Sequence, residues 1–156
     1  MTRLPSFPVG GGCVCGAVRY RLTAPPLAVY ACHCRDCQRS GSGPYAVYMI
    51  VPREAVDQTG GELARIERKA DSGRLVPQIS CALCGTRLWN DPPRFPETLV
   101  LRAGTLDDAT WARPVVHVWT QRKLPWVELG DDLQFEGQVP SRDVCFDAWR
   151  EYVERD

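Results

Sequence analysis

Residues 81–85 read Cys81-Ala82-Leu83-Cys84-Gly85, a Cys-x-x-Cys turn followed by glycine. The chain folds back over the two intervening residues, so both sulfur atoms can converge on one ion, and the glycine can take the positive φ that such a turn needs. A second close pair, Cys13-Val14-Cys15-Gly16, has the same terminal glycine. Because zinc prefers thiolate ligands, the two pairs together predict a closed four-thiolate site that is structural. A redox-active dithiol is the alternative.

A third group, Cys32-His33-Cys34-Arg35-Asp36-Cys37, supplies three thiols from one short segment. Three protein ligands leave the fourth position of a tetrahedral zinc for water or a substrate, which is the arrangement of catalytic zinc. The alternative is a second structural site that is completed by His33, Asp36 or a partner chain. Because His33 lies between two cysteines, we expect its side chain to point away from a metal that they share.

The remaining cysteine, Cys145, lies in a segment where apolar residues recur with helical spacing, so we expect a buried, inert thiol there. A framework of disulfides is the alternative use of eight cysteines, but Cys13 and Cys15 are too close to be bridged without strain. Residues 1–12 do not resemble a signal peptide. We therefore expect a cytoplasmic, reducing environment, in which thiols stay free or bind metal.

The chain of 156 residues suits one domain, and its 19 Lys and Arg balance its 19 Asp and Glu. This balance gives no electrostatic reason to expect nucleic acid or an anionic membrane as a partner. No apolar run approaches the ~20 residues that span a bilayer. The oligomeric state does not follow from the sequence.

Alternating apolar and polar residues predict a half-buried strand over 17–22, and other runs rich in β-branched and aromatic residues predict further strands. These are 45–51, 62–69, 98–103 and 115–120, with 87–89 as the return strand of a hairpin around the Cys-x-x-Cys turn. We expect a flexible lead at 10–12 and one helical turn at 107–110. A C-terminal helix carries Cys145 and Trp149 on one face, capped by Ser141 or Asp143.

The prediction is therefore a mainly β fold with a short C-terminal helix. We expect residues 1–138 to form the zinc-binding domain and residues 139–156 to form a helical extension packed on it.

Several motifs resemble those of the glutathione-dependent formaldehyde-activating enzymes, a family whose domain is shared with centromere protein V. The matching stretches are Gly12-Cys13-Val14-Cys15-Gly16-Ala17-Val18-Arg19-Tyr20, Cys32-His33-Cys34-Arg35-Asp36-Cys37-Gln38-Arg39-Ser40-Gly41, Cys81-Ala82-Leu83-Cys84-Gly85-Thr86, Gly104-Thr105-Leu106-Asp107-Asp108, His117-Val118-Trp119 and Lys123-x-x-Trp126. The resemblance runs from about residue 11 to about residue 137. Ser80 departs from the family pattern, in which an aromatic residue is common at this position.

The resemblance implies a β-tent, a folded-over set of antiparallel sheets stabilised by zinc. It implies two zinc ions per chain, with a structural ion on Cys13, Cys15, Cys81 and Cys84 and a second ion, at the active site, on Cys32, Cys34 and Cys37. The implied activity is the conversion of formaldehyde and glutathione to S-hydroxymethylglutathione. This reaction is carbon–sulfur lyase chemistry in reverse, and it makes glutathione the expected small-molecule partner.

We therefore predict a zinc-dependent carbon–sulfur lyase that joins or releases a small aldehyde and a thiol. The alternative is a non-catalytic thiol carrier or interaction module. A chromatin role, by analogy with centromere protein V, is disfavoured by the neutral charge balance and the lack of a basic tail. Arg39, His117, Lys123 and Trp126 could contact an anionic peptide-like ligand, but residues of these types are more often surface charges or packed rings, so no role is assigned to them.

Overall fold

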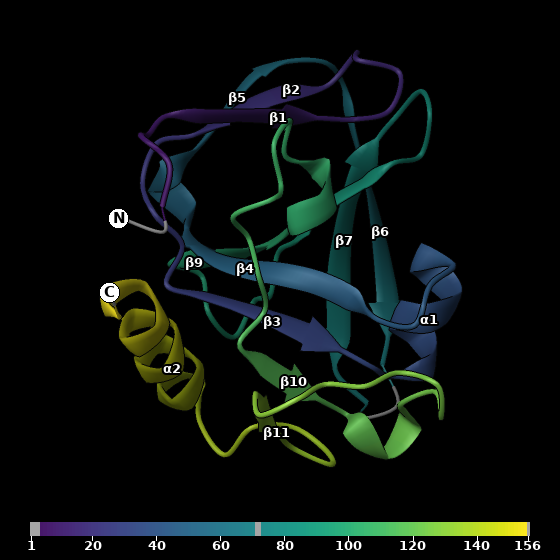
Figure 1. Ribbon diagram of the computed structural model, residues 1–156. Helices are drawn as coiled ribbons and strands as arrows, with labels where there is room; N and C mark the ends of the chain where they lie inside the picture. Colours follow the sequence, from purple (N-terminus) through teal and green to yellow (C-terminus); the bar gives the residue numbers. More distant parts are fainter. Residues whose placement is uncertain (1–3, 71–72, 156) are drawn as a thin grey trace.

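The computed structural model describes residues 4–70 and 73–155, and two β-sheets dominate it (Figure 1). The smaller sheet has the order β1-β2-β5 and consists of β1 (Val9–Gly12), β2 (Arg19–Leu22) and β5 (Val56–Gly60). The larger sheet has eight strands in the order β11-β10-β3-β4-β9-β8-β7-β6. Its strands are β3 (Ala28–Cys32), β4 (Ala46–Pro52), β6 (Leu63–Lys69), β7 (Leu75–Cys81), β8 (Arg87–Asn90), β9 (Thr98–Arg102), β10 (Val116–Val118) and β11 (Leu133–Gln134).

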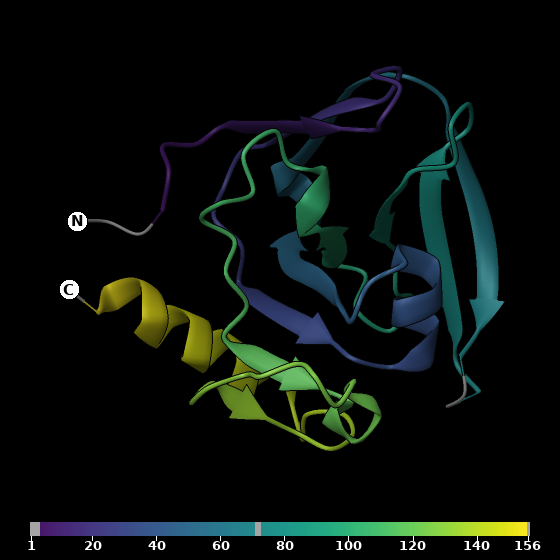
Figure 2. The same cartoon turned by 45° about the vertical axis from the view of Figure 1, so that its right-hand side comes forward.

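The larger sheet curves, so that the β6–β7 hairpin forms one wall while the smaller sheet crosses the top (Figure 2). Neighbouring strands are antiparallel, except that β10 runs parallel to both β3 and β11. The sheet is therefore mixed rather than purely antiparallel. The mainly β class that the sequence predicts is confirmed.

The core lies between the two sheets and is filled by side chains from both. The ring of Tyr20 on β2 meets that of Trp89 on β8 edge to face, with centroids 6.1 Å apart. Leu22, Met49 and Leu101 are fully buried in the same cluster. Burial of such apolar surface is the main force that holds the small sheet on the large one.

Strand β1 corrects the expectation of a flexible lead at residues 10–12. Gly11 pairs with Tyr20, and a Cβ atom built on Gly11 would come within 2.3 Å of the tyrosine Oη. The phenol, whose hydroxyl lies 2.8 Å from that of Thr105, needs the room that a side chain would take. The glycines are here a steric requirement of a strand and not a mark of flexibility.

The helical turn expected at 107–110 is also wrong, because the 3₁₀ turn lies earlier, at Ala103–Thr105. Asp107 is held instead by the small sheet, since its carboxylate accepts from Arg19 and its backbone N–H donates to the carbonyl of Gly10. The strand expected over 115–120 is shorter than predicted. It ends at Val118 because Trp119 has a left-handed backbone with φ of 59°.

The two α-helices flank β3, the strand that leads into the cysteine triplet. Helix α1 (Arg35–Gly41) follows β3 directly, and α2 (Arg142–Glu154) lies beside it (Figure 1). Ser141 is the N-cap of α2, and Cys145 and Trp149 are buried in the common core. The C-terminal helix is thus confirmed. The described helices are all too short or too polar to serve as a bilayer span.

Candidate metal centres

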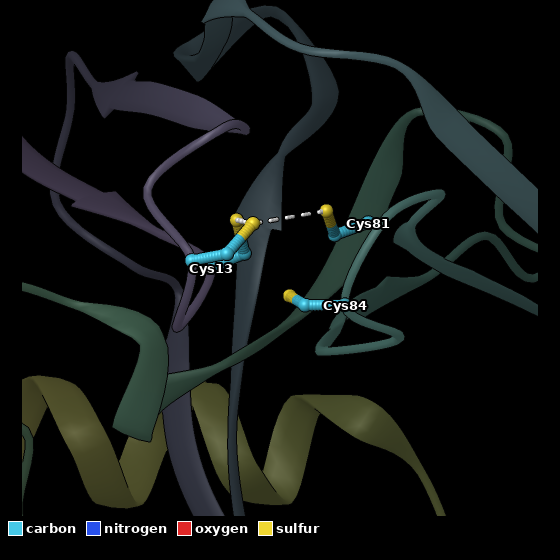
Figure 3. Close-up of side chains that lie close together, drawn as sticks. Cys13, Cys81 and Cys84 are labelled. Carbon is cyan, nitrogen blue, oxygen red and sulfur yellow. Dashed lines mark hydrogen bonds between the residues drawn. The ribbon is translucent and has the colours of Figure 1, made fainter.

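Four thiols from two distant segments meet where the small sheet approaches the large one. Cys13 and Cys15 follow β1, while Cys81 ends β7 and Cys84 lies in the turn before β8. Their four Sγ atoms all lie within 4.8 Å of one another, and those of Cys13 and Cys15 are 3.5 Å apart. Figure 3 shows Cys13, Cys81 and Cys84 pointing toward one another from the two segments. All four cysteines are free thiols, so this group could hold a metal ion.

Backbone hydrogen bonds build the two turns that present these thiols. The N–H of Gly16 donates to the carbonyl of Cys13, and the N–H of Gly85 donates to that of Cys81, at 3.1 and 3.0 Å. Gly16 and Gly85 have φ of 79° and 73°, the left-handed region that favours glycine. The glycines that follow the two cysteine pairs therefore close the turns.

Thr86 ties the two turns together. Its hydroxyl oxygen accepts from the N–H of Val14 at 3.2 Å and lies 3.0 Å from the sulfur of Cys84. Hydrogen bonds from the hydroxyl and backbone of Thr86 lower the pKa of Cys84 to about 5. Cys84 is thus favoured in the thiolate form that binds metal.

The second group of thiols lies at the junction of β3 and α1. Cys32 ends β3, Cys34 is the N-cap of α1, and Cys37 lies in its first turn. The sulfur of Cys34 accepts from the N–H of Cys37 at 3.4 Å, and the three Sγ atoms lie within 4.8 Å of one another. Within residues 4–70 and 73–155, no fourth His, Cys, Asp or Glu ligand atom belongs to this group.

Both residues that could have completed the second site have other partners. The imidazole Nε2 of His33 lies 2.9 Å from Nδ1 of His117, and Asp36 accepts from Arg68 at 2.7 Å. His33 therefore points away from the thiols, as its place between two cysteines predicts. The described chain thus offers three candidate ligands here, which would leave a tetrahedral ion one open position.

The donor set of the second group fits a soft divalent metal. Hydrogen bonds from the thiols of Cys32 and Cys37 stabilise the thiolate of Cys34 and lower its pKa to about 2, while the same contacts and burial raise the pKa of Cys32. Cys32 and Cys37 are buried, so all three can be ionised together only beside a cation. A divalent ion would supply that charge.

A second layer of polar groups reaches the thiols from the sheet. The hydroxyl of Tyr48 on β4 lies 3.4 Å from the sulfur of Cys37, and a guanidinium N–H of Arg102 on β9 donates to the same hydroxyl oxygen at 3.4 Å. Because Arg102 can only donate, the tyrosine O–H is left to point at the sulfur. Such contacts orient a metal ligand and tune how strongly it donates.

A buried histidine pair holds the backbone between Cys32 and Cys34 in place. His33 and His117 are both almost fully buried, and Tyr45 packs its ring against both. Burial lowers the pKa of His33 to about 4 and also lowers that of His117, so both are neutral at pH 7. The pair joins the loop after β3 to β10, which lies 84 residues away in sequence.

We expect His117→Phe to lower the free energy of unfolding by about 1–3 kcal/mol, because it leaves a buried nitrogen of His33 without a partner. Urea denaturation followed by circular dichroism measures this loss, and metal analysis should find the metal content unchanged. An unchanged free energy of unfolding would mean that the two rings do not bond in solution.

A cavity of about 460 Å³ lies over α1, the helix that contains Cys37 and has Cys34 as its N-cap. Its lining consists of Arg35, Gln38, Arg39, Ser42, Gly43, Pro44, Leu124 and Trp126. Of the four residues named above as possible ligand contacts, Arg39 and Trp126 lie in this cavity. Lys123 instead donates to the carbonyl of Val127 at 2.6 Å, and His117 lines a separate cavity of about 260 Å³.

The sequence did not point to Thr86, Tyr48, Arg102 or Gln38 as neighbours of the sites. Gln38 bridges the carbonyls of His33 and Arg122 at 2.7 and 2.9 Å and so ties α1 to the segment that follows β10. Thr86 and Gln38 each follow a cysteine within two residues, and this closeness in sequence is the signal that could have identified them as neighbours of the sites. Tyr48 and Arg102 reach the site through strand pairing and carry no local signal.

The family profile and a curated relative point to the same family. Residues 8–122 match the profile of the family described as "Glutathione-dependent formaldehyde-activating enzyme". A protein of Halomonas elongata that carries this family's name is 32% identical over 124 residues, which cover 76% of this chain and 79% of that protein. A crystal structure of a Rhodobacter sphaeroides protein aligns with 81% of this chain and 98% of its own, at 17% identity and a TM-score of 0.47.

The matched segment contains β1 to β10 and includes all seven grouped cysteines. The three cysteine motifs of the sequence resemblance thus form the two thiol groups, and both groups lie within the matched segment. The chain belongs to the glutathione-dependent formaldehyde-activating enzyme family.

Proposed function

We propose that this protein is a zinc-dependent carbon–sulfur lyase of the formaldehyde-activating type. It joins or releases a small aldehyde and a thiol such as glutathione. Zinc is the proposed metal because all seven donors are thiols, and thiolate sets with tetrahedral spacing select zinc.

The contrast between the two thiol groups carries the proposal. The group of Cys13, Cys15, Cys81 and Cys84 has four thiols and would close the coordination sphere. The group of Cys32, Cys34 and Cys37 has three, with His33 and Asp36 turned to other partners. Only the second group leaves a position at which a substrate could bind, so we assign the chemistry to it.

The chemistry at the second site needs few steps. A carbon–sulfur bond forms between the thiol sulfur and the aldehyde carbon, and the thiol proton ends on the aldehyde oxygen. Release is the reverse. Cys32, Cys34 and Cys37 would hold the zinc, which would supply Lewis acidity for ionising a thiol or polarising a carbonyl. Tyr48 and Arg102 keep Cys37 oriented, and the rigid junction of β3 and α1 fixes where the reactants meet.

The cavity over α1 is the proposed binding site for the peptide part of a thiol such as glutathione. Glutathione carries two carboxylates, and Arg35 and Arg39 both line this cavity. Arg35 is already bonded to the side-chain oxygen of Gln38, which leaves its other N–H groups to face a ligand. Trp126, 69% exposed, offers an apolar face at the rim. Guanidinium groups bind carboxylates through paired, charge-assisted hydrogen bonds.

The test is the exchange rate between formaldehyde, glutathione and their adduct, measured by two-dimensional exchange NMR. Because the adduct also forms spontaneously, we expect an exchange rate that rises in proportion to enzyme concentration above the uncatalysed rate. An exchange rate that does not change with enzyme concentration would contradict the lyase proposal.

Calorimetry provides the matched control. Glutathione and S-methylglutathione share both carboxylates, but only the free thiol can ligate a metal. The proposal predicts tighter binding of glutathione, with proton release on binding. Binding of glutathione without any acceleration of exchange is the result that a thiol carrier would give.

A further inference from the structure

Strand β6 is the outer edge of the larger sheet. It pairs with β7 on one side, and in residues 4–70 and 73–155 no strand pairs with its other side. Figure 2 shows it as the outermost strand of the wall formed by the β6–β7 hairpin. At seven residues it is as long as any strand in the described structure, whereas the opposite edge, β11, has two. A long open edge is a template for pairing with another chain.

The backbone hydrogen bonds identify which groups face outward. Bonds flank the hairpin at both ends, from the N–H of Ala82 to the carbonyl of Glu62 and from the N–H of Ala70 to that of Arg74, each 2.9 Å long. Bonded and non-bonded positions alternate in an antiparallel pair. The even-numbered residues of β6 therefore bond to β7, and the N–H and C=O groups of Leu63, Arg65, Glu67 and Lys69 face outward.

The side chains at the centre of this edge are open to a partner. Ile66 is 60% exposed, and the side chains of Arg65 and Glu67 on either side of it are 48% and 52% exposed. Arg65 and Glu67 share one face of the sheet, with a nitrogen of one 3.4 Å from an oxygen of the other. An exposed apolar residue with opposite charges on its two sides is a self-complementary pattern.

We propose that β6 is a homodimer interface, in which a second copy of this chain adds its own β6 antiparallel across a twofold axis at Ile66. This register sets Ile66 opposite Ile66 of the partner, in a non-hydrogen-bonded pair where side chains lie closest. It sets Arg65 opposite the partner's Glu67 and Glu67 opposite the partner's Arg65. It also sets Leu63 opposite the partner's Lys69, so that every outward N–H and C=O of the strand has a counterpart.

Two neighbouring registers would also pair the outward N–H and C=O groups of the two strands, but they set like charges opposite each other. A shift by two residues one way places Arg65 opposite Arg65, and a shift the other way places Glu67 opposite Glu67 and Arg65 opposite Lys69. Like charges directly opposite each other destabilise a strand pair. Among these antiparallel registers, the charges thus select one. The partner they select is a second copy, since a twofold axis makes both halves of the interface the same.

Sedimentation equilibrium over about a hundredfold range of concentration tests the interface, because dimers dissociate on dilution. The wild type is expected to be a concentration-dependent dimer. Glu67→Arg sets two positive charges opposite two others and should sediment as a folded monomer. Arg65→Glu should do the same with negative charges. Circular dichroism verifies the fold of each, since Arg65 also lies 3.6 Å from Asp91.

Mixing the two monomeric variants separates charge pairing from damage to the strand. An equal mixture places the two central glutamates of the Arg65→Glu chain opposite the two central arginines of the Glu67→Arg chain, and should restore the dimer. The double variant R65E/E67R should dimerise by itself. A wild type that stays monomeric throughout the concentration range overturns the proposal, as does a Glu67→Arg variant that remains dimeric or a mixture that stays monomeric.

Discussion

Cys84→Ser is expected to unfold the protein under conditions in which the wild type is stable. Cys84 is exposed, and serine has nearly the same shape as cysteine, so without a metal the change would cost within about 0.5 kcal/mol. With a metal, it removes one of four ligands from a site that joins the turn after β1 to the turn after β7. Structural zinc contributes about 10–16 kcal/mol in small domains, against a typical total stability of about 5–15 kcal/mol.

Circular dichroism and urea denaturation of Cys84→Ser measure this effect. Val14→Ser is the matched control, because Val14 is 91% exposed and lies in the facing turn between two ligands. We expect the control to unfold at the wild-type urea concentration. A Cys84→Ser variant as stable as this control would show that the four thiols hold no structural metal.

Cys34→Ser is expected to abolish the enzyme-dependent exchange of formaldehyde and glutathione while the fold is retained. All three ligands of the second group come from the short junction of β3 and α1, so an ion there ties no distant segments together. Serine is also a favoured N-cap and can accept the hydrogen bond that the sulfur of Cys34 receives from the N–H of Cys37. The free energy of unfolding should therefore change by only about 1 kcal/mol.

Exchange NMR and thermal denaturation of Cys34→Ser test this pair of expectations. Cys145→Ala is the control, because Cys145 is a buried thiol of α2 that belongs to neither group. The control should lose some stability from its small cavity but keep the catalysed exchange. Full activity in Cys34→Ser would remove the second group from the proposed mechanism.

The elements that could be predicted from the sequence are those marked by a pattern within a short segment. Alternation in residues 17–22 marks β2, and the helical spacing of Cys145 and Trp149 marks α2. The grouping of thiols follows from short spacings, because a Cys-x-x-Cys turn brings two sulfurs together wherever it lies. The metal that these groups hold stays a prediction.

The parts that were missed depend on contacts between distant residues. The glycine at position 11 suggests a flexible segment in the sequence, but in the structure the phenol of Tyr20 occupies the space that a side chain would need. The pairing of His33 with His117 exists only because β10 runs parallel to β3, an arrangement that no pattern within either strand encodes. Tyr48 likewise meets Cys37 across the sheet. Local patterns thus predict elements and ligands but not the residues that support the ligands.

If the seven thiols divide into a closed group of four and an open group of three, the two groups should respond differently to the loss of one thiol. Native mass spectrometry of the wild type, Cys34→Ser and Cys84→Ser tests it most directly by counting bound zinc in each. We expect about two ions in the wild type, about one in a folded Cys34→Ser, and an unfolded Cys84→Ser without the structural ion. Equal losses of zinc and of structure in the two variants would contradict the division.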